Sequence, residues 1–509
     1  MINNIKNRTN WICYIFTGFI LLQPFLDLAT SLMRRFGFSV TLGIAIRAIF
    51  MVFCFLCVLF FSRKRESKVS AVYLLIVCVY CLCFLAVSFF RGGLAMALDN
   101  LRELIKTFYF IFVLFALYEA YKTYQQYIPD SALTFAIFGY TLVIFLAFVT
   151  NTSFDSYTSG KGYNGWFYAA NEISAIISIL GPIAILYCHK ILLKKYDDTS
   201  TFIKTIHYLF AAICLILIAF CAVFIGTKVV FLGILAYTVC CTVWWGVRSF
   251  SNRTKRNLIG LGLTVLMIFA IGGLFTVSPL RANLQGYVGY HYSRLVREPI
   301  ETVPESKMEP DDSQALSNTT QMNTEVATQS EGGDHPEREM MDSKLYRLLN
   351  WLLSNRLEYI QPSIQAFFQG DIVTHIFGIG YTNMPDSIYN IEKAIEMDGL
   401  AILFRHGYAG ALLFLLPIAY ILLKALRLLF SNIKTRLMSL EFWTYLYSLI
   451  LGLCIAFFTG HTLVAPSVSI YVAVVCIRII QLQGDVNNRI MHSERKPSLV
   501  SKKEGDLEH

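Results

Sequence analysis

The chain has 509 residues, of which 56% are hydrophobic and only 15% are charged, and its formal net charge is +9. Soluble domains carry a charge on roughly a quarter of their residues, so this composition excludes an ordinary soluble protein. The basic residues stand between long apolar runs, which is typical of membrane topology and argues against nucleic-acid binding.

Apolar runs of about 18 to 22 residues recur along the chain, and each can cross a hydrocarbon core roughly 30 Å thick. They predict an all-α polytopic membrane protein. The first run contains Gln23, Pro24 and Asp27 and lacks a small-residue cleavage site, so we expect a retained helix rather than a signal peptide. About twelve spanning helices are predicted, near residues 11–32, 40–61, 69–90, 104–121, 131–149, 167–188, 206–225, 228–247, 257–276, 400–423, 440–458 and 463–482.

The short loops predict the orientation of these helices, because cytoplasmic loops carry an excess of Lys and Arg. This bias places both termini in the cytoplasm. The basic loops are residues 63–68, 189–195, 248–256 and 424–436, together with the C-terminal tail.

Four regions follow from this topology. Residues 1–276 hold helices one to nine, 277–399 form an extracytoplasmic loop, 400–482 hold helices ten to twelve, and 483–509 form a cytoplasmic tail.

The large loop has two parts of different composition. Residues 298–342 are acidic and rich in Ser and Thr, and such a segment buries too little apolar surface to fold. Residues 343–369 repeat Leu at helical spacing. They predict an amphipathic helix that lies on the membrane or packs on the other helices.

Ionisable residues gather at the predicted outer ends of the helices, where charge is costly and calls for a reason. Each also has a purely structural interpretation, as a headgroup anchor, a helix cap or one half of an ion pair. The candidates are Arg102, Lys106, Glu172, Lys228, Arg294, Arg356, Glu396, Asp398, Arg405 and His406.

Two kinds of chemistry are combined in this set. Cations from several distant segments suit an anionic group such as a diphosphate. A carboxylate nearby suits a general base that takes a proton from a hydroxyl. Together they indicate glycosyl transfer from a lipid diphosphate at the outer face of the membrane.

Several short motifs resemble, in their order, the O-antigen polymerase and ligase family, including capsule-type polymerases of Gram-positive bacteria. The resemblance covers nearly the whole chain. It rests on QPFLDL at 23–28, GWFYAANE at 165–172, GTKVVFLG at 226–233, SNRLEYI at 354–360, FGIGYTN at 377–383 and EMDGLAILFRHGYAGALLFLLP at 396–417.

This resemblance implies a GT-C-like membrane enzyme of the bacterial cytoplasmic membrane, inverting and independent of metals and cofactors. It would polymerise oligosaccharide repeat units linked to undecaprenyl diphosphate. Its expected partners are this lipid-linked glycan and the membrane lipids, with a flippase and a chain-length regulator as candidate protein partners. The alternatives are a ligase that moves a finished glycan to a wall or lipid acceptor, and a polysaccharide or lipid transporter.

The resemblance also assigns roles to residues. Lys228 and Arg356 are similar to the family's phosphate-binding cations, with Arg102, Lys106 or Arg294 as further candidates. Ligase-type members carry a histidine where this chain has Glu396, so the implied base is Glu396 or Asp398.

Overall fold

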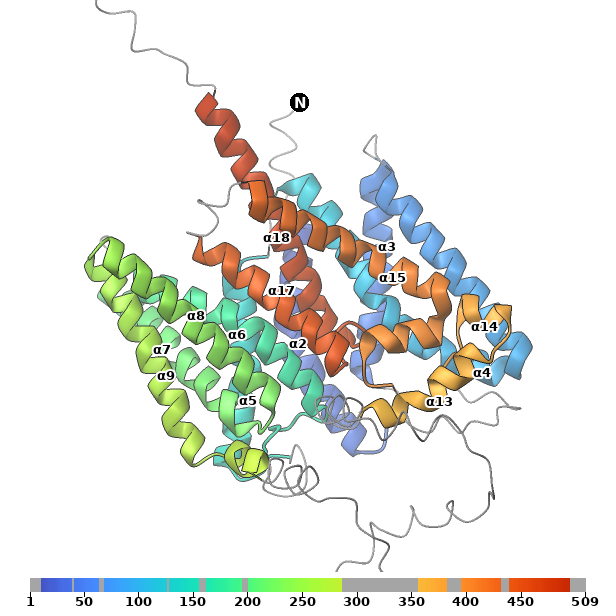
Figure 1. Cartoon of the computed structure of the whole chain (residues 1–509), viewed down its shortest axis with the longest axis horizontal. Coiled ribbons are helices and arrows are strands. Elements are labelled where there is room, and N and C mark those ends of the chain that lie inside the picture. The colour runs from blue at the N-terminus through green and yellow to red at the C-terminus, as the bar shows by residue number, and fades with distance from the viewer. Residues whose placement is uncertain are drawn as a thin grey trace, which may run out of the picture. The chain divides into compact units, whose positions relative to one another are not determined.

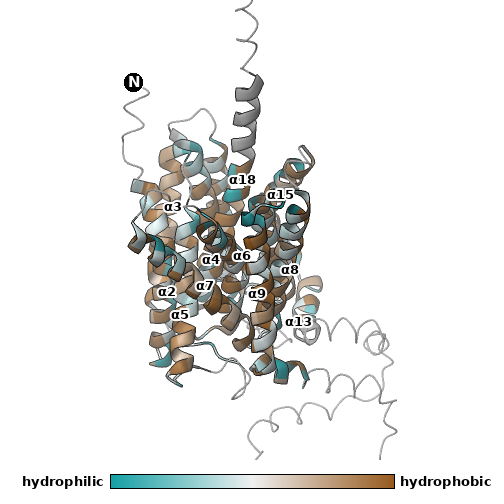
Figure 2. Ribbon diagram, turned by 90° about the vertical axis from the view of Figure 1, so that its left-hand side faces the viewer, coloured by the Kyte–Doolittle hydropathy of each residue, from teal (hydrophilic) through white to brown (hydrophobic). Residues whose placement is uncertain are grey.

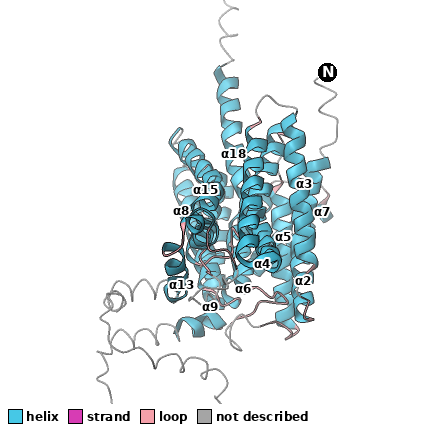
Figure 3. Cartoon of the chain, turned by 90° about the vertical axis from the view of Figure 1, so that its right-hand side faces the viewer, coloured by secondary structure: helices cyan, strands magenta, loops and turns pink. Residues whose placement is uncertain are grey.

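The computed structural model of the chain describes residues 11–38, 41–63, 68–125, 128–154, 162–194, 200–285, 356–381, 395–431 and 439–494, without the side chains of 63, 356–359, 431 and 483–494. The chain divides into two units, of which the second, Leu284–Glu358, lies almost wholly outside these ranges. Nearly all of the described residues belong to the first unit, Met1–Asn283 with Tyr359–His509. Within the described ranges every regular element is a helix (Figure 3).

Ten of the described helices are long and apolar enough to cross a membrane, and the apolar part of an eleventh, Pro466–Leu482 of α18, is shorter. The predicted all-α polytopic membrane fold is therefore confirmed. The helices are α2 (Trp11–Arg35), α3 (Leu42–Arg63), α4 (Val69–Tyr124), α5 (Asp130–Val149), α6 (Ala170–Leu192), α7 (Thr201–Phe224), α8 (Lys228–Ser251), α9 (Lys255–Thr276), α13 (Arg356–Phe368), α14 (Ile372–Phe377), α15 (Asp398–Ser431), α17 (Leu440–Phe458) and α18 (Pro466–Glu494).

The long helix α4 accounts for two of the predicted helices. Its 56 residues include a break in the helical backbone at Gly92 and Gly93, and Gly93 has a φ of 72°. Glycine adopts this left-handed conformation without the steric cost that a side chain would bring. The predicted helices at 69–90 and 104–121 are thus the two arms of one bent element.

The helix α6 lies at the centre of the first unit. It packs against α5, α7, α8, α17 and α18, and nearly every residue from Ile173 to Leu186 is buried. Other helices of this unit expose large apolar side chains, such as Phe90 and Phe250, each 85% exposed. Figure 2 shows hydrophobic residues along most of the helix lengths. A surface of this kind suits lipid, where helices satisfy their own backbone hydrogen bonds.

The helices α18 and α13 mark the two ends of the helix bundle. The last turns of α18 and the helix α13 lie at opposite ends of the bundle (Figure 1). Helix α13 is the described part of the predicted amphipathic helix at 343–369; its first part, like the acidic segment 298–342, lies outside the described residues.

Candidate active site

A cavity of about 330 Å³ lies where the ends of several helices meet. Its walls come from the end of α2, the first turns of α3, α6, α15 and α18, the second arm of α4, and the turn that leads into α18. The predicted topology places all of these on the outer side. Ligand sites commonly occupy roughly 300–1,000 Å³. The ionisable side chains that line the cavity are Asp27, Arg34, Arg47, Glu103, Lys106, Glu172, Arg405 and His461.

At the inner wall of the cavity, Arg47 and Asp27 form a buried ion pair, with 2.5 Å between Arg47 Nη2 and Asp27 Oδ1. Gln23 Oε1 accepts two further hydrogen bonds from Arg47, and Tyr140 donates its hydroxyl to Asp27 Oδ2. Charges removed from water must be paired and hydrogen-bonded. This cluster explains why the first predicted helix contains Gln23 and Asp27, and it fixes α2 against α3.

A second pair joins Lys106 and Glu103 on α4, with 2.5 Å between Nζ and Oε1. Both side chains are partly exposed and both line the cavity. Arg102, the other candidate diphosphate ligand on α4, is exposed and does not line the cavity. Of these two predicted diphosphate ligands, the structure brings only Lys106 to the site.

Arg405 and His406 are neighbours on α15 that point in different directions. Arg405 lines the cavity, with its guanidinium 4.8 Å from the centre of the Tyr381 ring. His406 is fully buried beside the rings of Phe84 and Phe108. Its Nε2 lies 2.6 Å from the Tyr381 hydroxyl. The sequence prediction that His406 binds substrate is therefore replaced by a positioning contact: His406 holds Tyr381, and Tyr381 stacks on Arg405.

A glycine turn fixes this part of α15. Ile379 and Gly380 donate backbone N–H groups to the carbonyls of Phe404 and Arg405, at 2.9 and 3.2 Å. The close approach requires Gly378 and Gly407, with φ of 85° and 66°. A Cβ on Gly407 would lie 2.4 Å from the Ile376 carbonyl oxygen. Helix α15 bends at Gly407, two residues after Arg405, where it packs against this glycine turn.

Asp398, predicted as a catalytic base, anchors a turn. Its side chain is buried and accepts the backbone N–H groups of His461, Thr462 and Leu463 at 2.7, 2.9 and 2.6 Å. Its carboxylate does not line the cavity, whereas His461 does. Glu396 is half-buried and is likewise absent from the cavity wall, although Ile395 lines it.

Glu172 stands in the first turn of α6 and lines the cavity. It accepts a hydrogen bond from the hydroxyl of Ser467, which belongs to the first turn of α18. No cation among the described residues forms an ion pair with Glu172. Among the described carboxylates that line the cavity, Glu172 is therefore the one without a cationic partner, whereas Asp27 and Glu103 each form an ion pair.

The other predicted ligands are Lys228, Arg294 and Arg356. Lys228 begins α8, is half-buried and does not line the cavity. The preceding Thr227 donates to the hydroxyl of Ser174 on α6 at 3.1 Å, close in sequence to Glu172. Arg294 lies outside the described residues, and so does the side chain of Arg356, whose backbone begins α13.

Sequence reasoning did not select Arg34, Tyr381 or His461 as site residues. Arg34 is exposed and places its guanidinium 5.3 Å from the Tyr168 ring centre. In the part of the chain that the structure describes, no carboxylate forms an ion pair with Arg34 or Arg405. The sequence offered one signal for Tyr381. It stands within the glycine motif at 377–383, and the apolar helix that follows contains Arg405, a charge that such a helix does not need.

The described residues contain no cluster of three or more His, Cys, Asp or Glu side chains arranged to hold a metal ion. The charge of the cavity comes from its arginines and lysine. Among the described residues four cations and three carboxylates line it, so the cavity carries more positive than negative groups. Arginine suits a phosphate group particularly well, because its planar donors can bind two oxygens at once.

The fold and the cavity define a polytopic α-helical membrane protein with a cation-rich site where helix ends meet. A family model described as O-antigen ligase like membrane protein matches residues 6–484, nearly the whole chain, and the chain belongs to this family. The predicted resemblance is thereby confirmed. Comparison with curated proteins gives no match.

Proposed function

We propose that the protein is a glycosyltransferase that polymerises oligosaccharide repeat units linked to undecaprenyl diphosphate on the outer face of the cytoplasmic membrane. The observation that carries this proposal is the cavity itself. It holds Arg34 and Arg405 on different helices, each with an aromatic contact and without a carboxylate partner among the described residues, and it also holds Glu172.

The two arginines would bind the diphosphate of the donor. Their contacts with Tyr168 and Tyr381 orient the guanidinium groups without neutralising them. As the bond between the anomeric carbon and the diphosphate oxygen breaks, negative charge accumulates on the leaving group. Preorganised cations stabilise that charge in the transition state, so the reaction can proceed without a metal ion.

Glu172 would act as the general base. The acceptor hydroxyl attacks the anomeric carbon from the side opposite the diphosphate and gives its proton to Glu172, so the anomeric configuration inverts. Glu172 then releases the proton to water, and undecaprenyl diphosphate departs. We place Glu172 before Glu396 because it lines the cavity, and before Asp398 because all three hydrogen bonds of Asp398 serve the backbone at 461–463.

A ligase that transfers a finished glycan is the second candidate, and the description of the matching family favours it. The chemistry at the cavity would be the same and the acceptor would differ. Lys228 and Arg356 remain candidates for the diphosphate in both cases, on the resemblance of their motifs.

The test uses the full chain reconstituted in lipid, supplied with a synthetic polyprenyl-diphosphate repeat unit. A polymerase produces a ladder of chain lengths, whereas a ligase transfers one block to a separate acceptor. Arg34→Ala combined with Arg405→Ala should abolish product formation, while Arg427→Ala, at the far end of α15, should not. Normal product formation by the double variant would disprove the assignment of the diphosphate site.

A further inference from the structure

A second site lies between α8 and α17, away from the cavity. The two helices are joined by hydrogen bonds from the Tyr447 hydroxyl to the Gly233 carbonyl (2.6 Å) and between the hydroxyls of Tyr237 and Thr444 (2.7 Å). Beyond these contacts, toward the start of α17, an apolar groove of about 670 Å³ runs between the helices.

The groove opens to the lipid-facing surface. Val243 and Val247 on α8 are each 61% exposed, and Ile450 on α17 is 49% exposed. Trp244 and Trp443 line the same groove from its two sides. Tryptophan is enriched at the membrane–water interface, and a lipid chain is the apolar occupant that such a place offers.

A polar pocket of about 380 Å³ continues the groove. It shares Arg248 and Ser251 with the groove and adds Asn252, Thr254, Arg256 and Asn257. The turn from α8 to α9 that forms it is held in place by Asn257, whose Nδ2 donates to the Asn252 carbonyl at 2.7 Å. Thr254 caps α9 by accepting the backbone N–H of Asn257.

The charge of this turn is one-sided. Arg248, Arg253, Lys255 and Arg256 stand within nine residues that contain no Asp or Glu. Arg248 lies over the Trp244 ring at 5.2 Å, and the other three are exposed. None of the four forms an ion pair with a carboxylate in the ranges that the structure describes. The topology predicts that this turn is cytoplasmic.

We propose that the groove and the α8–α9 turn bind an anionic phospholipid of the cytoplasmic leaflet. Its phosphate contacts Arg248 and Arg256, and one acyl chain occupies the groove between α8 and α17. The leaflet's negative lipids attract basic segments next to membrane helices. The inference needs no assumption about the enzymatic reaction, since it rests on a groove at the other end of α8 from Lys228.

The test measures lipid binding to the purified full chain by native mass spectrometry and by thermal unfolding in a neutral detergent. Dioleoyl phosphatidylglycerol should remain bound and raise the unfolding temperature, whereas dioleoyl phosphatidylcholine should do neither. Arg248→Ala combined with Arg256→Ala should weaken phosphatidylglycerol binding about 30-fold, given the usual contribution of each basic residue near an anionic surface. Val243→Trp, which fills the groove, should also weaken it.

A matched control removes two other basic residues from the same predicted side, Lys204→Ala and Arg427→Ala. It should retain phosphatidylglycerol binding, because neither residue lines the groove or the pocket. Equal loss in the control would reduce the effect to general surface charge and overturn the proposal. Glycerol phosphate carries the phosphate without acyl chains. If it displaced phosphatidylglycerol at concentrations as low as those at which the lipid itself binds, the groove would contribute nothing to binding and the proposal would be overturned.

Discussion

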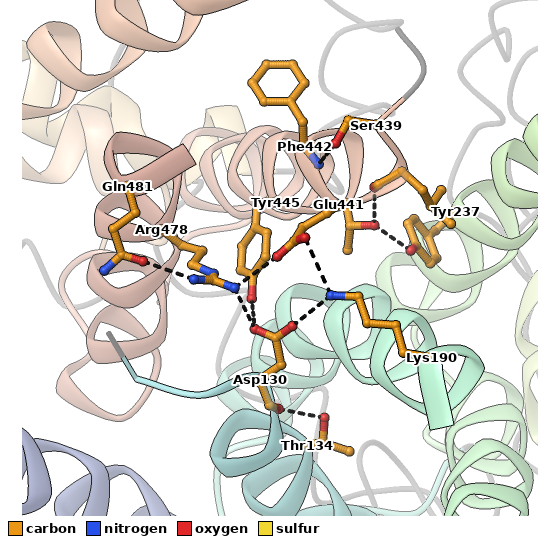
Figure 4. A network of polar contacts seen from close by, with 12 residues as sticks. Asp130, Thr134, Lys190, Tyr237, Ser439, Glu441, Phe442, Tyr445, Arg478 and Gln481 are labelled. Carbon is orange, nitrogen blue, oxygen red and sulfur yellow. Dashed lines mark hydrogen bonds and ion pairs between the residues drawn. The ribbon is translucent and has the colours of Figure 1, made fainter. Parts of the chain in front are cut away.

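Two clusters of charged side chains lie at opposite ends of the helix bundle, and they differ in how completely their charges are matched. At the start of α5 and α17, Asp130 and Glu441 alternate with Lys190 and Arg478 (Figure 4). The Tyr445 hydroxyl also donates to Asp130. At the other end, Arg34 and Arg405 line the cavity without a described carboxylate partner.

The two clusters also differ in the volume of the cavity beside them. The cavity next to Arg478 and Tyr445 measures about 30 Å³, enough for about two water molecules at most, whereas the one beside Arg405 measures about 330 Å³. Similar residue types therefore serve two purposes. Where carboxylates match the cations and no room remains, the charges join helices; where cations exceed their partners around a cavity, they can bind an anion.

The largest effect should come from Glu172→Gln, which removes the proposed base while keeping the shape of the side chain. Loss of a general base costs roughly 10²- to 10⁴-fold in rate. Initial rates of product formation on a lipid-linked donor measure it, with thermal unfolding as the check that the variant folds. Glu396→Gln is the matched comparison: if it removes activity and Glu172→Gln does not, the base is Glu396.

Arg478→Ala tests the matched cluster. It leaves Asp130 buried with fewer partners, and breaking a buried ion pair costs about 3–5 kcal/mol. The free energy of unfolding in mixed micelles should fall by that amount, while the rate per folded molecule stays near wild type. A stable variant with greatly reduced activity would show that this end of the bundle takes part in the reaction.

Asp398→Asn should act on stability more than on chemistry. The amide replaces one acceptor oxygen with a donor facing the backbone N–H groups at 461–463, and an unsatisfied buried polar group costs about 1–3 kcal/mol. The same unfolding measurement detects it. Activity lost in a variant that unfolds like wild type would instead support Asp398 as the base.

The smallest effects should come from two substitutions that distinguish the role of the Tyr381 hydroxyl from that of its ring. Tyr381→Phe removes the hydroxyl that contacts His406 and Thr107 and should cost about 0.5–1.5 kcal/mol of stability, with activity nearly retained. Tyr381→Leu also removes the ring under Arg405 and should lower the rate per folded molecule below that of Tyr381→Phe. Equal rates in the two variants would show that the stacking contact does not orient Arg405.

Much of the fold follows from the sequence alone. Apolar runs long enough to span a membrane predicted each spanning helix found among the described residues, because in lipid each helix must satisfy its own backbone groups and its length is set by the bilayer. The two arms of α4 were predicted as separate helices, and only the structure shows that they form one element bent at Gly92 and Gly93. The FGIGYTN motif at 377–383, noted from the sequence, forms the glycine turn before α15.

The site was only partly predictable. Lys106, Glu172 and Arg405 were chosen because charge at the mouth of a membrane helix needs a reason, and all three line the cavity. Arg34 gave no comparable signal, since an exposed arginine is ordinary in any sequence.

What the sequence determined, then, is the class of protein, its spanning helices and the end of the bundle where charge collects. The tertiary structure decided which charges are matched. Arg405 and His406 are adjacent in the chain, yet one lines the cavity and the other is buried behind Tyr381. Asp398 resembles a base in sequence but accepts three backbone N–H groups in space. Spacing along a chain fixes the face of a helix, whereas the partners on that face come from other segments, here 25 to 65 residues away.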